Sequence, residues 1–275
     1  MALSKFEVFA GWKPLSVVSV LLNIPSLRRF IPEGTTSWTN DTLKEVVRGL
    51  LKADEALVKE VEDDLKRRPR SELDHLGGGG GQGYMLDLLP RLQEQYGSTD
   101  PGVLVALLCM NFLVLEPGEA LFIPADGIHA YLSGDIVECM ARSNNVLNSG
   151  FCPRADRDSI DLFAETLTFK ALGKKDIMLP AKDSESGADG YTVEYAPPIK
   201  EFTMFKTDLL GNLEEHIREQ AGPSVAIVTR GGGILTVEGK DYPANEGYIF
   251  FIAPKTALRW RTIEGMEIHM AAVVE

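Results

Sequence analysis

The chain has 275 residues and a formal net charge of −12, from 28 lysines and arginines against 40 aspartates and glutamates. With 44% hydrophobic and 25% charged residues it has a globular composition, long enough for one large or two ordinary domains, which excludes an intrinsically disordered chain. The acidic balance argues against nucleic-acid binding, because contacts to phosphates require a basic surface. Three cysteines without CxxC spacing do not form a secreted disulfide framework, and four histidines allow only a histidine-poor metal site.

The N-terminal residues show no targeting pattern. Residues 1–14 mix Lys5, Glu7 and Lys13 with apolar residues, whereas a signal peptide has a basic start followed by an apolar run. The longest apolar stretches, residues 16–22 and 103–114, are shorter than the roughly 20 residues that cross a bilayer. We therefore expect a cytoplasmic protein without a membrane or nucleic-acid partner.

Residues 14–100 are expected to form a helical domain. Pro14 and Pro25 bound a first apolar segment, as proline does at helix ends. An N-cap signal at residues 39–42 opens one long amphipathic run that continues to Leu65, and residues 84–96 predict a further helix. In the long run the apolar residues recur at three- and four-residue steps: Leu43, Val46, Val47, Leu50, Leu51, Leu57, Val58, Val61 and Leu65.

Five consecutive glycines begin the segment 77–83. A phosphate-binding loop is excluded, because no strand precedes these glycines and no Gly-Lys-Ser or Gly-Lys-Thr follows them. We interpret residues 77–83 as a flexible linker between helices.

Beyond residue 101 the pattern becomes strand-like. Residues 103–115 are apolar and β-prone in their second half, residues 120–124 and 136–141 predict strands, and Asp158 is expected to cap a short helix. After a polar loop at residues 181–190, short predicted strands alternate with turns at 202–207, 225–229, 233–237, 248–252 and 268–274. Such a series is typical of a β-sandwich or jelly roll.

Two segments share one pattern of turn residues. The segment from Gly118 to His129 has glycine, five residues, proline, four residues and histidine, and residues 247–258 repeat this spacing with alanine for proline and Leu258 for histidine. The pattern resembles the second motif of the cupin superfamily, whose β-barrels often hold a metal ion. Leucine does not bind metals, so the second copy predicts a barrel with a structural role.

His129 is the candidate metal ligand. A lone histidine at a strand end is most often a hydrogen-bonded structural residue, but Tyr131, Asp135 and Glu138 follow it closely. Strand alternation places His129 and Tyr131 on one face of the predicted strand. An imidazole with a carboxylate suits zinc, although one histidine does not make a complete site.

The sequence resembles type I mannose-6-phosphate isomerases, of the fungal kind, over most of its length. Residues 115–141, with Leu-Glu-Pro-Gly-Glu-Ala-Leu-Phe-Ile-Pro-Ala-Asp-Gly-Ile-His followed by Ala-Tyr-Leu-Ser-Gly-Asp-Ile-Val-Glu-Cys-Met-Ala, carry the resemblance most strongly. Residues 1–14 and 195–206 also resemble the family, and residues 20–95 do so more loosely.

The resemblance implies an α+β fold with cupin-like β-barrel and jelly-roll elements, an inserted helical domain and a C-terminal jelly roll without metal ligands. Under this interpretation residues 1–13 are a remnant of the catalytic barrel and residues 14–100 are the helical domain. Residues 101–180 are then part of the catalytic cupin barrel, and residues 181–275 are the C-terminal cupin-like barrel.

The resemblance also implies a reaction. Members of the family interconvert mannose 6-phosphate and fructose 6-phosphate with one zinc ion, through an enediol, and so supply GDP-mannose synthesis. This chemistry needs a base, a Lewis acid and cationic groups for the phosphate. Matched by motif, His129 corresponds to the family's downstream zinc histidine, Tyr131 to a substrate-binding position and Glu138 to a catalytic position at the sugar site.

Two departures from the family pattern stand out. Asn148 occupies the position of an arginine considered catalytic in the family, and an amide lacks the charge and the two-pronged donor geometry of a guanidinium. Arg154 stands where relatives usually have lysine and is the best candidate for binding phosphate, ahead of Arg142 and Arg157.

The second departure concerns zinc. The family's other zinc ligands are a Gln-x-His pair and a glutamate, and this sequence contains no Gln-x-His. The resemblance implies a family member without its first third, through truncation, an alternative start or a gene-model error. With His129 as one ligand of four, we expect zinc to bind weakly or not at all.

Two hypotheses about function remain open. The chain is a mannose-6-phosphate isomerase by family, or it is a truncated or diverged cupin-like protein that binds sugar phosphate or has a structural role without catalysis. We expect the first as the family's function and the second for this polypeptide assayed alone. In both, the expected partner is a sugar phosphate, and the oligomeric state is left open.

Overall fold

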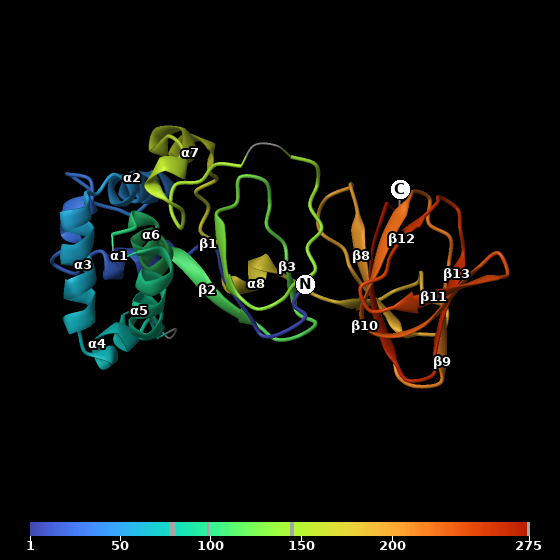
Figure 1. Cartoon of the computed structure of the whole chain (residues 1–275). Coiled ribbons are helices and arrows are strands. Elements are labelled where there is room, and N and C mark those ends of the chain that lie inside the picture. The colour runs from blue at the N-terminus through green and yellow to red at the C-terminus, as the bar shows by residue number, and fades with distance from the viewer. Residues whose placement is uncertain (77–80, 98, 144–145, 274–275) are drawn as a thin grey trace.

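The computed structural model describes residues 1–76, 81–97, 99–143 and 146–273 of the chain. Figure 1 shows the helices at one end of the molecule, a small β-structure in the middle and a second β-structure at the other end. This mixed helix and sheet architecture confirms the predicted α+β fold. Of the linker predicted at 77–83, residues 77–80 lie outside the described residues.

The helical end contains a short 3-10 helix at Arg28–Phe30 and six α-helices, counted over the described residues. They are α1 (Leu15–Leu21), α2 (Asn40–Leu51), α3 (Glu55–Arg67), α4 (Arg70–His75), α5 (Tyr84–Tyr96) and α6 (Pro101–Cys109). The range of α5 confirms the helix predicted over 84–96. The apolar residues predicted to line the long amphipathic run are buried, except Leu57, which is half-buried, and they pack into one core together with α1, α5 and α6.

The single long helix predicted from residue 39 to 65 is wrong, because the chain starts a new helix at Glu55. The Asp54 side chain accepts a hydrogen bond from the Leu57 backbone N–H at 2.8 Å and so caps α3. A capping aspartate inside an amphipathic run can therefore divide it into two helices while its apolar face stays continuous.

Helix α6 occupies the first half of the apolar stretch 103–115, and strand β2 (Met110–Leu115) occupies the second half, where β-structure was predicted. Asp100 caps the helix and Pro101 stands at its first turn, so this stretch has a strong helix start. All nine residues of α6 are buried among the other helices. The structure thus places residues 101–109 with the helices; the division into four domains remains a prediction.

The middle of the molecule is built on an antiparallel sheet with the order β2-β1-β4, where β1 is Phe6–Trp12 and β4 is His129–Ser133. Beside it, β3 (Ala120–Leu121) pairs with β5 (Met178–Leu179), which follows the short helix α8 (Lys174–Ile177). Because β1 lies between β2 and β4, residues far apart in the sequence form one half-barrel.

Two predictions for this region are wrong. In the segment predicted as a strand at 136–141, Ile136 forms a single β-bridge with Ala2 and no strand is formed. The few residues before β1 are too short to pair with it over a longer distance. The short helix α7 (Ile160–Thr166) is capped by Ser159, whose hydroxyl accepts from the Leu162 backbone N–H at 3.3 Å. The predicted cap, Asp158, instead accepts from a backbone N–H of an earlier loop.

The C-terminal β-structure is a curled antiparallel sheet with the order β6-β7-β8-β14-β10-β13-β9, in which β11 and β12 also pair with β10. Its strands are β6 (Lys182–Asp183), β7 (Thr192–Tyr195), β8 (Thr203–Leu209), β9 (Leu213–Ile217), β10 (Ser224–Val237), β11 (Lys240–Asn245), β12 (Ile249–Ile252), β13 (Leu258–Thr262) and β14 (Met266–Ala272). Side chains such as Phe205 and Trp260 fill its interior.

Three details of the C-terminal predictions need correction. The strands predicted at 225–229 and 233–237 are one strand, β10, because Gly231 adopts φ +72° and lets the chain bend without breaking the ladder. The loop predicted at 181–190 contains β6. Strands β7, β9, β11 and β13 were not predicted, because charged and polar residues on their solvent faces interrupt the apolar pattern. None of the described helices is long and apolar enough to cross a membrane.

Candidate functional site

His129 and Tyr131 lie side by side on β4, at the edge of the half-barrel. Their ring centroids are 5.4 Å apart, which confirms that the two side chains share one face of the strand. Ala10 on β1 pairs with His129 and fixes its register. His129 Nδ1 lies 3.0 Å from the Gly127 carbonyl oxygen, which can only accept, so Nδ1 donates this hydrogen bond and leaves Nε2 as the nitrogen that can bind an external group.

Tyr131 and Glu138 form the best-defined polar contact of this region. The Tyr131 hydroxyl donates to Glu138 Oε1 at 2.6 Å, across the turn that follows β4. Burial and the neighbouring Glu138 carboxylate both raise the pKa of Tyr131, so the phenol stays a neutral donor. The Phe6 ring, 5.3 Å away, supports the Tyr131 ring from the side. The contact fixes an exposed carboxylate beside Tyr131, the ring neighbour of His129.

Asn148 lies in a separate loop, and Arg154 begins the short 3-10 helix Arg154–Asp156 that follows it. The Asn148 backbone N–H donates to Asp158 Oδ2 at 2.7 Å, and the Asp158 backbone N–H donates back to the Asn148 carbonyl at 2.7 Å. The Arg154 side chain is 82% exposed and lies 3.5 Å from Glu55 at the start of α3. Among the described residues no contact joins Asn148 or Arg154 to the group on β4, so the structure brings three of the five predicted site residues together.

Asp100 anchors this loop to the helices, a role that the sequence analysis missed. Its carboxylate accepts from the backbone N–H groups of Gly102 and Phe151, both at 2.8 Å, and lies 3.3 Å from Arg157. Burial raises the pKa of Asp100 while these hydrogen bonds lower it, and burial outweighs them. The Asp-Pro-Gly sequence signals the helix cap, but nothing in it signals the link to Phe151.

The residues of the half-barrel do not fit a zinc site by themselves. In the part of the chain that the structure describes, no group of three or more histidine, cysteine, aspartate or glutamate side chains could hold a metal ion. A zinc ion in a protein takes three or four such ligands, and His129 alone supplies one.

In the second barrel, Leu258 takes the place of His129. It starts β13 as His129 starts β4, but it is only 5% exposed and packs in the barrel core. A core side chain fills the position at which the first copy of the repeat presents an imidazole.

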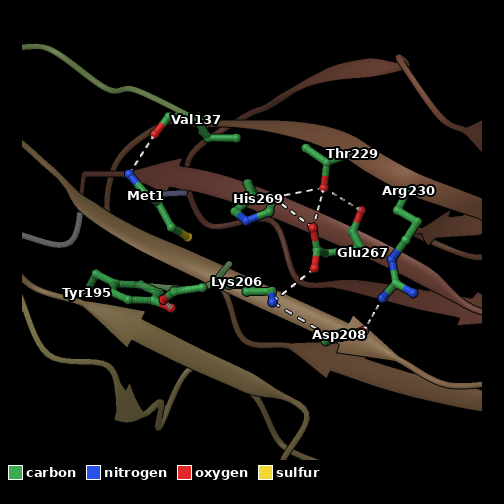
Figure 2. A network of polar contacts seen from close by, with 10 residues as sticks. Met1, Val137, Tyr195, Lys206, Asp208, Thr229, Arg230, Glu267 and His269 are labelled. Carbon is green, nitrogen blue, oxygen red and sulfur yellow. Dashed lines mark hydrogen bonds and ion pairs between the residues drawn. The ribbon is translucent and has the colours of Figure 1, made fainter. Parts of the chain in front are cut away.

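A second polar cluster, not found from the sequence, lies on β8, β10 and β14 (Figure 2). Lys206 Nζ lies 2.9 Å from one Glu267 oxygen, and the Thr229 hydroxyl donates to the other at 2.9 Å. Burial raises the pKa of Glu267, but the contacts with Lys206 and Thr229 outweigh burial and lower it. His269, 2% exposed, lies 3.0 Å from the Thr229 hydroxyl, and burial lowers its pKa to about 4, so the imidazole is neutral at neutral pH.

The two β-structures meet beside this cluster. The Tyr195 hydroxyl donates to the Gly118 carbonyl at 2.6 Å, and Tyr195 and Met204 pack on Ala120 of β3. The first copy of the repeat is therefore in direct contact with the second barrel. A half-barrel joined in this way to a curled antiparallel sheet defines a two-barrel protein of the cupin fold.

Known proteins show the same fold and a related sequence. No protein-family model matches the chain. Mannose-6-phosphate isomerase of Cryptococcus neoformans is 31% identical over 99% of this chain and 68% of its own length, and that of Saccharomyces cerevisiae is 34% identical over 92% and 62%. The mannose 6-phosphate isomerase of Salmonella typhimurium, in a structure with fructose 6-phosphate and zinc, superposes with a TM-score of 0.78 at 20% identity and covers all of this chain and 65% of that one.

These comparisons confirm the predicted resemblance. The chain belongs to the mannose-6-phosphate isomerase family. The sequence relation to the fungal enzymes shows the family, and the likeness to the bacterial structure shows the fold. The chain spans between 62% and 68% of the length of three fungal relatives, from Cryptococcus neoformans, Saccharomyces cerevisiae and Schizosaccharomyces pombe.

Proposed function

We propose that this chain serves the interconversion of mannose 6-phosphate and fructose 6-phosphate, as the part of a mannose-6-phosphate isomerase that carries His129, Tyr131 and Glu138. The observation that supports this most directly is the 2.6 Å hydrogen bond between Tyr131 and Glu138 beside the His129 ring. The names of the fungal relatives supply the reaction. The product would supply GDP-mannose synthesis, in the cytoplasm.

The reaction moves a proton between adjacent carbons of the opened sugar, through an enediol. It therefore needs a base held at a fixed distance from those carbons and a donor for the sugar oxygens. The Glu138 carboxylate can act as the base, because the Tyr131 hydroxyl orients it and leaves its second oxygen for the substrate. Tyr131 also presents an aromatic face on which a sugar ring or chain can lie.

We propose further that this polypeptide alone neither retains stoichiometric zinc nor turns over the substrate. The bacterial structure contains zinc, but in the described part of this chain His129 has no second and third ligand beside it. Asn148 also argues against turnover by this chain alone, because its loop is fixed to Asp158 and its amide cannot stabilise an oxyanion as a guanidinium does. Arg154, whose side chain is 82% exposed, is the proposed phosphate contact.

The alternative is a cupin-like protein that binds sugar phosphate without converting it. The same observation favours it: a Tyr131–Glu138 pair that can bind a sugar, without a complete metal centre around it. The two functions differ in turnover and in zinc content, while they share the binding of fructose 6-phosphate.

The test is to purify the chain, equilibrate it with zinc and measure zinc by mass spectrometry, turnover by a coupled assay and fructose 6-phosphate binding by calorimetry. We expect less than one zinc per chain, no turnover, and binding that Tyr131→Phe and Glu138→Gln weaken about tenfold. Tyr242 is exposed on β11, so Tyr242→Phe is the matched control and should leave the binding of fructose 6-phosphate unchanged.

Each outcome decides one part of the proposal. One tightly held zinc with measurable turnover would show that the chain is an isomerase by itself. Binding that is equally weak in Tyr131→Phe and Tyr242→Phe would remove the β4 site from the proposal. A comparison of Asn148→Arg with the native chain then tests whether the missing guanidinium limits turnover.

A further inference from the structure

Residues 1–4 pair with the segment that leads to Glu138. The Val137 N–H donates to the Met1 carbonyl at 2.9 Å, and the Met1 nitrogen donates to the Val137 carbonyl at 3.1 Å (Figure 2). Glu138 directly follows Val137, and its carboxylate accepts the hydrogen bond from Tyr131. The contacts with residues 1–4 therefore fix the backbone from which the Glu138 carboxylate extends.

Asp135 and Ser4 reinforce this pairing with their side chains. The Ser4 hydroxyl donates to Asp135 Oδ2 at 3.1 Å, and the Asp135 backbone N–H donates to the Ser4 hydroxyl oxygen at 2.8 Å. The Asp135 carbonyl also accepts from the Leu3 N–H at 2.8 Å. Gly134 has φ +100°, and a β-carbon there would overlap the Lys5 carbonyl oxygen, so the turn lies directly against the N-terminal segment. A reciprocal pair of hydrogen bonds thus holds the turn that follows β4.

The second barrel supports the other side of the N-terminal segment. The Tyr195 hydroxyl on β7 donates to the Gly118 carbonyl at 2.6 Å. The Gly118 N–H donates to the Ala2 carbonyl, and the Ala2 N–H donates to the Glu119 carbonyl, both at 2.9 Å. Removing the Tyr195 hydroxyl would leave the half-buried Gly118 carbonyl without this donor. A continuous set of hydrogen bonds therefore runs from the second barrel, through residues 1–4, to the loop of Glu138.

Glu138 depends on such support because its own loop is irregular. Apart from the bridge at Ile136, the described residues of the segment 134–143 form neither a helix nor a strand, and Glu138 itself is exposed. A base that moves a proton between two carbons acts only when its oxygen is held at those carbons, and a displacement of about 1 Å can slow such a reaction about a hundredfold. The contacts that hold this loop in place therefore bear on the function of its carboxylate.

We propose that Asp135 and Tyr195 are positioning residues for Glu138. Asp135 acts directly, through Ser4, and Tyr195 acts from the second barrel, through Gly118 and the N-terminal segment. This inference rests on the proposed function, in which Glu138 is the base. It also gives the second barrel, where Leu258 stands at the position of the histidine, a part in the sugar site of the first.

Hydrogen exchange at the Val137 amide tests whether the two residues hold the loop, without any ligand. We expect Asp135→Ala to accelerate this exchange about tenfold and Tyr195→Phe about threefold, because each removes one support of the pairing. Asp135→Asn should leave the rate within about twofold of the native one, since its side-chain oxygen still accepts from Ser4. Tyr191→Phe is the matched control for Tyr195→Phe, because Tyr191 is exposed just before β7.

The binding of fructose 6-phosphate tests whether this support reaches the site. Asp135→Ala should raise the dissociation constant about fivefold and Tyr195→Phe about threefold, while Asp135→Asn and Tyr191→Phe change it less than about twofold. Asp135→Ala and Asp135→Asn remove the same negative charge, so their difference reports the hydrogen bond with Ser4. In a Glu138→Gln background neither Asp135→Ala nor Tyr195→Phe should weaken binding further, because both act through the Glu138 carboxylate. Circular dichroism confirms that all variants fold.

The outcomes separate this inference from the proposed function. If the native chain binds fructose 6-phosphate but Asp135→Ala matches Asp135→Asn, or Tyr195→Phe matches Tyr191→Phe, the positioning role is wrong while the proposed function stands. Equal losses of affinity with and without Glu138→Gln would show a general structural role and overturn the inference. A native chain that does not bind fructose 6-phosphate would overturn the proposed function, and the exchange of the Val137 amide would then decide whether Asp135 and Tyr195 hold the loop.

Discussion

Asp126 and Lys255 occupy the same place in the two copies of the repeat and share the left-handed backbone conformation, with φ of 61° and 58°. Each copy begins at a glycine that also has a positive φ, 89° at Gly118 and 84° at Gly247. The shared turn residues that the sequence displays are therefore two copies of one backbone path. In both, this path delivers the chain to the start of a strand, β4 or β13.

Gly118 tests this backbone path. A β-carbon added at Gly118 meets nothing closer than Lys206 Nζ at 3.9 Å, so the strain of Gly118→Ala comes from φ alone. We expect Gly118→Ala to lower the free energy of unfolding by about 1 to 2 kcal/mol. Gly49→Ala, in the middle of α2, should raise it by about 0.5 to 1 kcal/mol, because alanine favours the helix. Urea titration measures the free energy of unfolding of both variants, and a change in the same direction for both would contradict the prediction.

The fold was predictable where the pattern of residues is repeated or periodic. Apolar residues at three- and four-residue steps in α2 and α3 indicated the helical end, and the repeat around Gly118 and Gly247 indicated two related barrels. The break at Asp54 and the continuity of β10 were not predictable, because they depend on one capping hydrogen bond and on a bend at Gly231. Local patterns do not report which of two competing backbone paths is stabilised by contacts elsewhere.

The site was predictable in part for the same reason. His129 and Tyr131 are two residues apart on a strand, so alternation alone places them together. Glu138 joins them through a turn that no periodicity describes, and the family resemblance named it. Asp100 and the cluster around Glu267 were missed, because their partners come from distant strands and loops.

Asp100 should be the most sensitive of the helix caps. Because its buried carboxylate joins α6 to Phe151 and Arg157, we expect Asp100→Ala to lower the free energy of unfolding by about 2 to 4 kcal/mol. Asp54→Ala, at an exposed cap, should cost about 1 kcal/mol. Hydrogen exchange at the Phe151 amide separates the two, since only Asp100→Ala should accelerate it; an unchanged rate would show that Asp100 does not hold the loop.

Glu62 makes the stability of the helical core depend on pH. Its side chain is fully buried on α3, and burial raises its pKa from 4.5 to about 7, although a hydrogen bond from Gln93 opposes this. The folded chain therefore keeps a proton that the unfolded chain has lost between these values. The free energy of unfolding should fall as pH rises from 4.5 to about 7.

Replacing the carboxyl group tests this pH dependence. Glu62→Gln should raise the free energy of unfolding at neutral pH by about 1 to 3 kcal/mol and remove the fall, since an amide does not ionise. Glu94→Gln is the control, because Glu94 is exposed on the neighbouring helix α5. Denaturant titrations at several pH values measure the slope. A slope that persists in Glu62→Gln would assign the pH dependence to another group.

Lys13 should make the free energy of unfolding change with pH in the opposite direction to Glu62, and in a higher pH range. It is 3% exposed where β1 meets the helices, donates to the Leu107 carbonyl and lies over the Tyr84 ring at 5.5 Å. Burial lowers its pKa from 10.5 to about 7, so the unfolded chain binds more protons between these values. The free energy of unfolding should therefore rise with pH above neutrality.

Lys13→Met keeps the length of the side chain and removes the charge. We expect it to raise the free energy of unfolding at neutral pH by about 1 to 3 kcal/mol and to flatten the rise between pH 7 and 9, below the range in which the Cys109 thiol titrates. Lys5→Met, exposed just before β1, should change neither the value nor the slope. If Lys13→Met destabilised the chain at both pH values, the hydrogen bond to Leu107 and the contact with Tyr84 would outweigh the cost of burying the ammonium group.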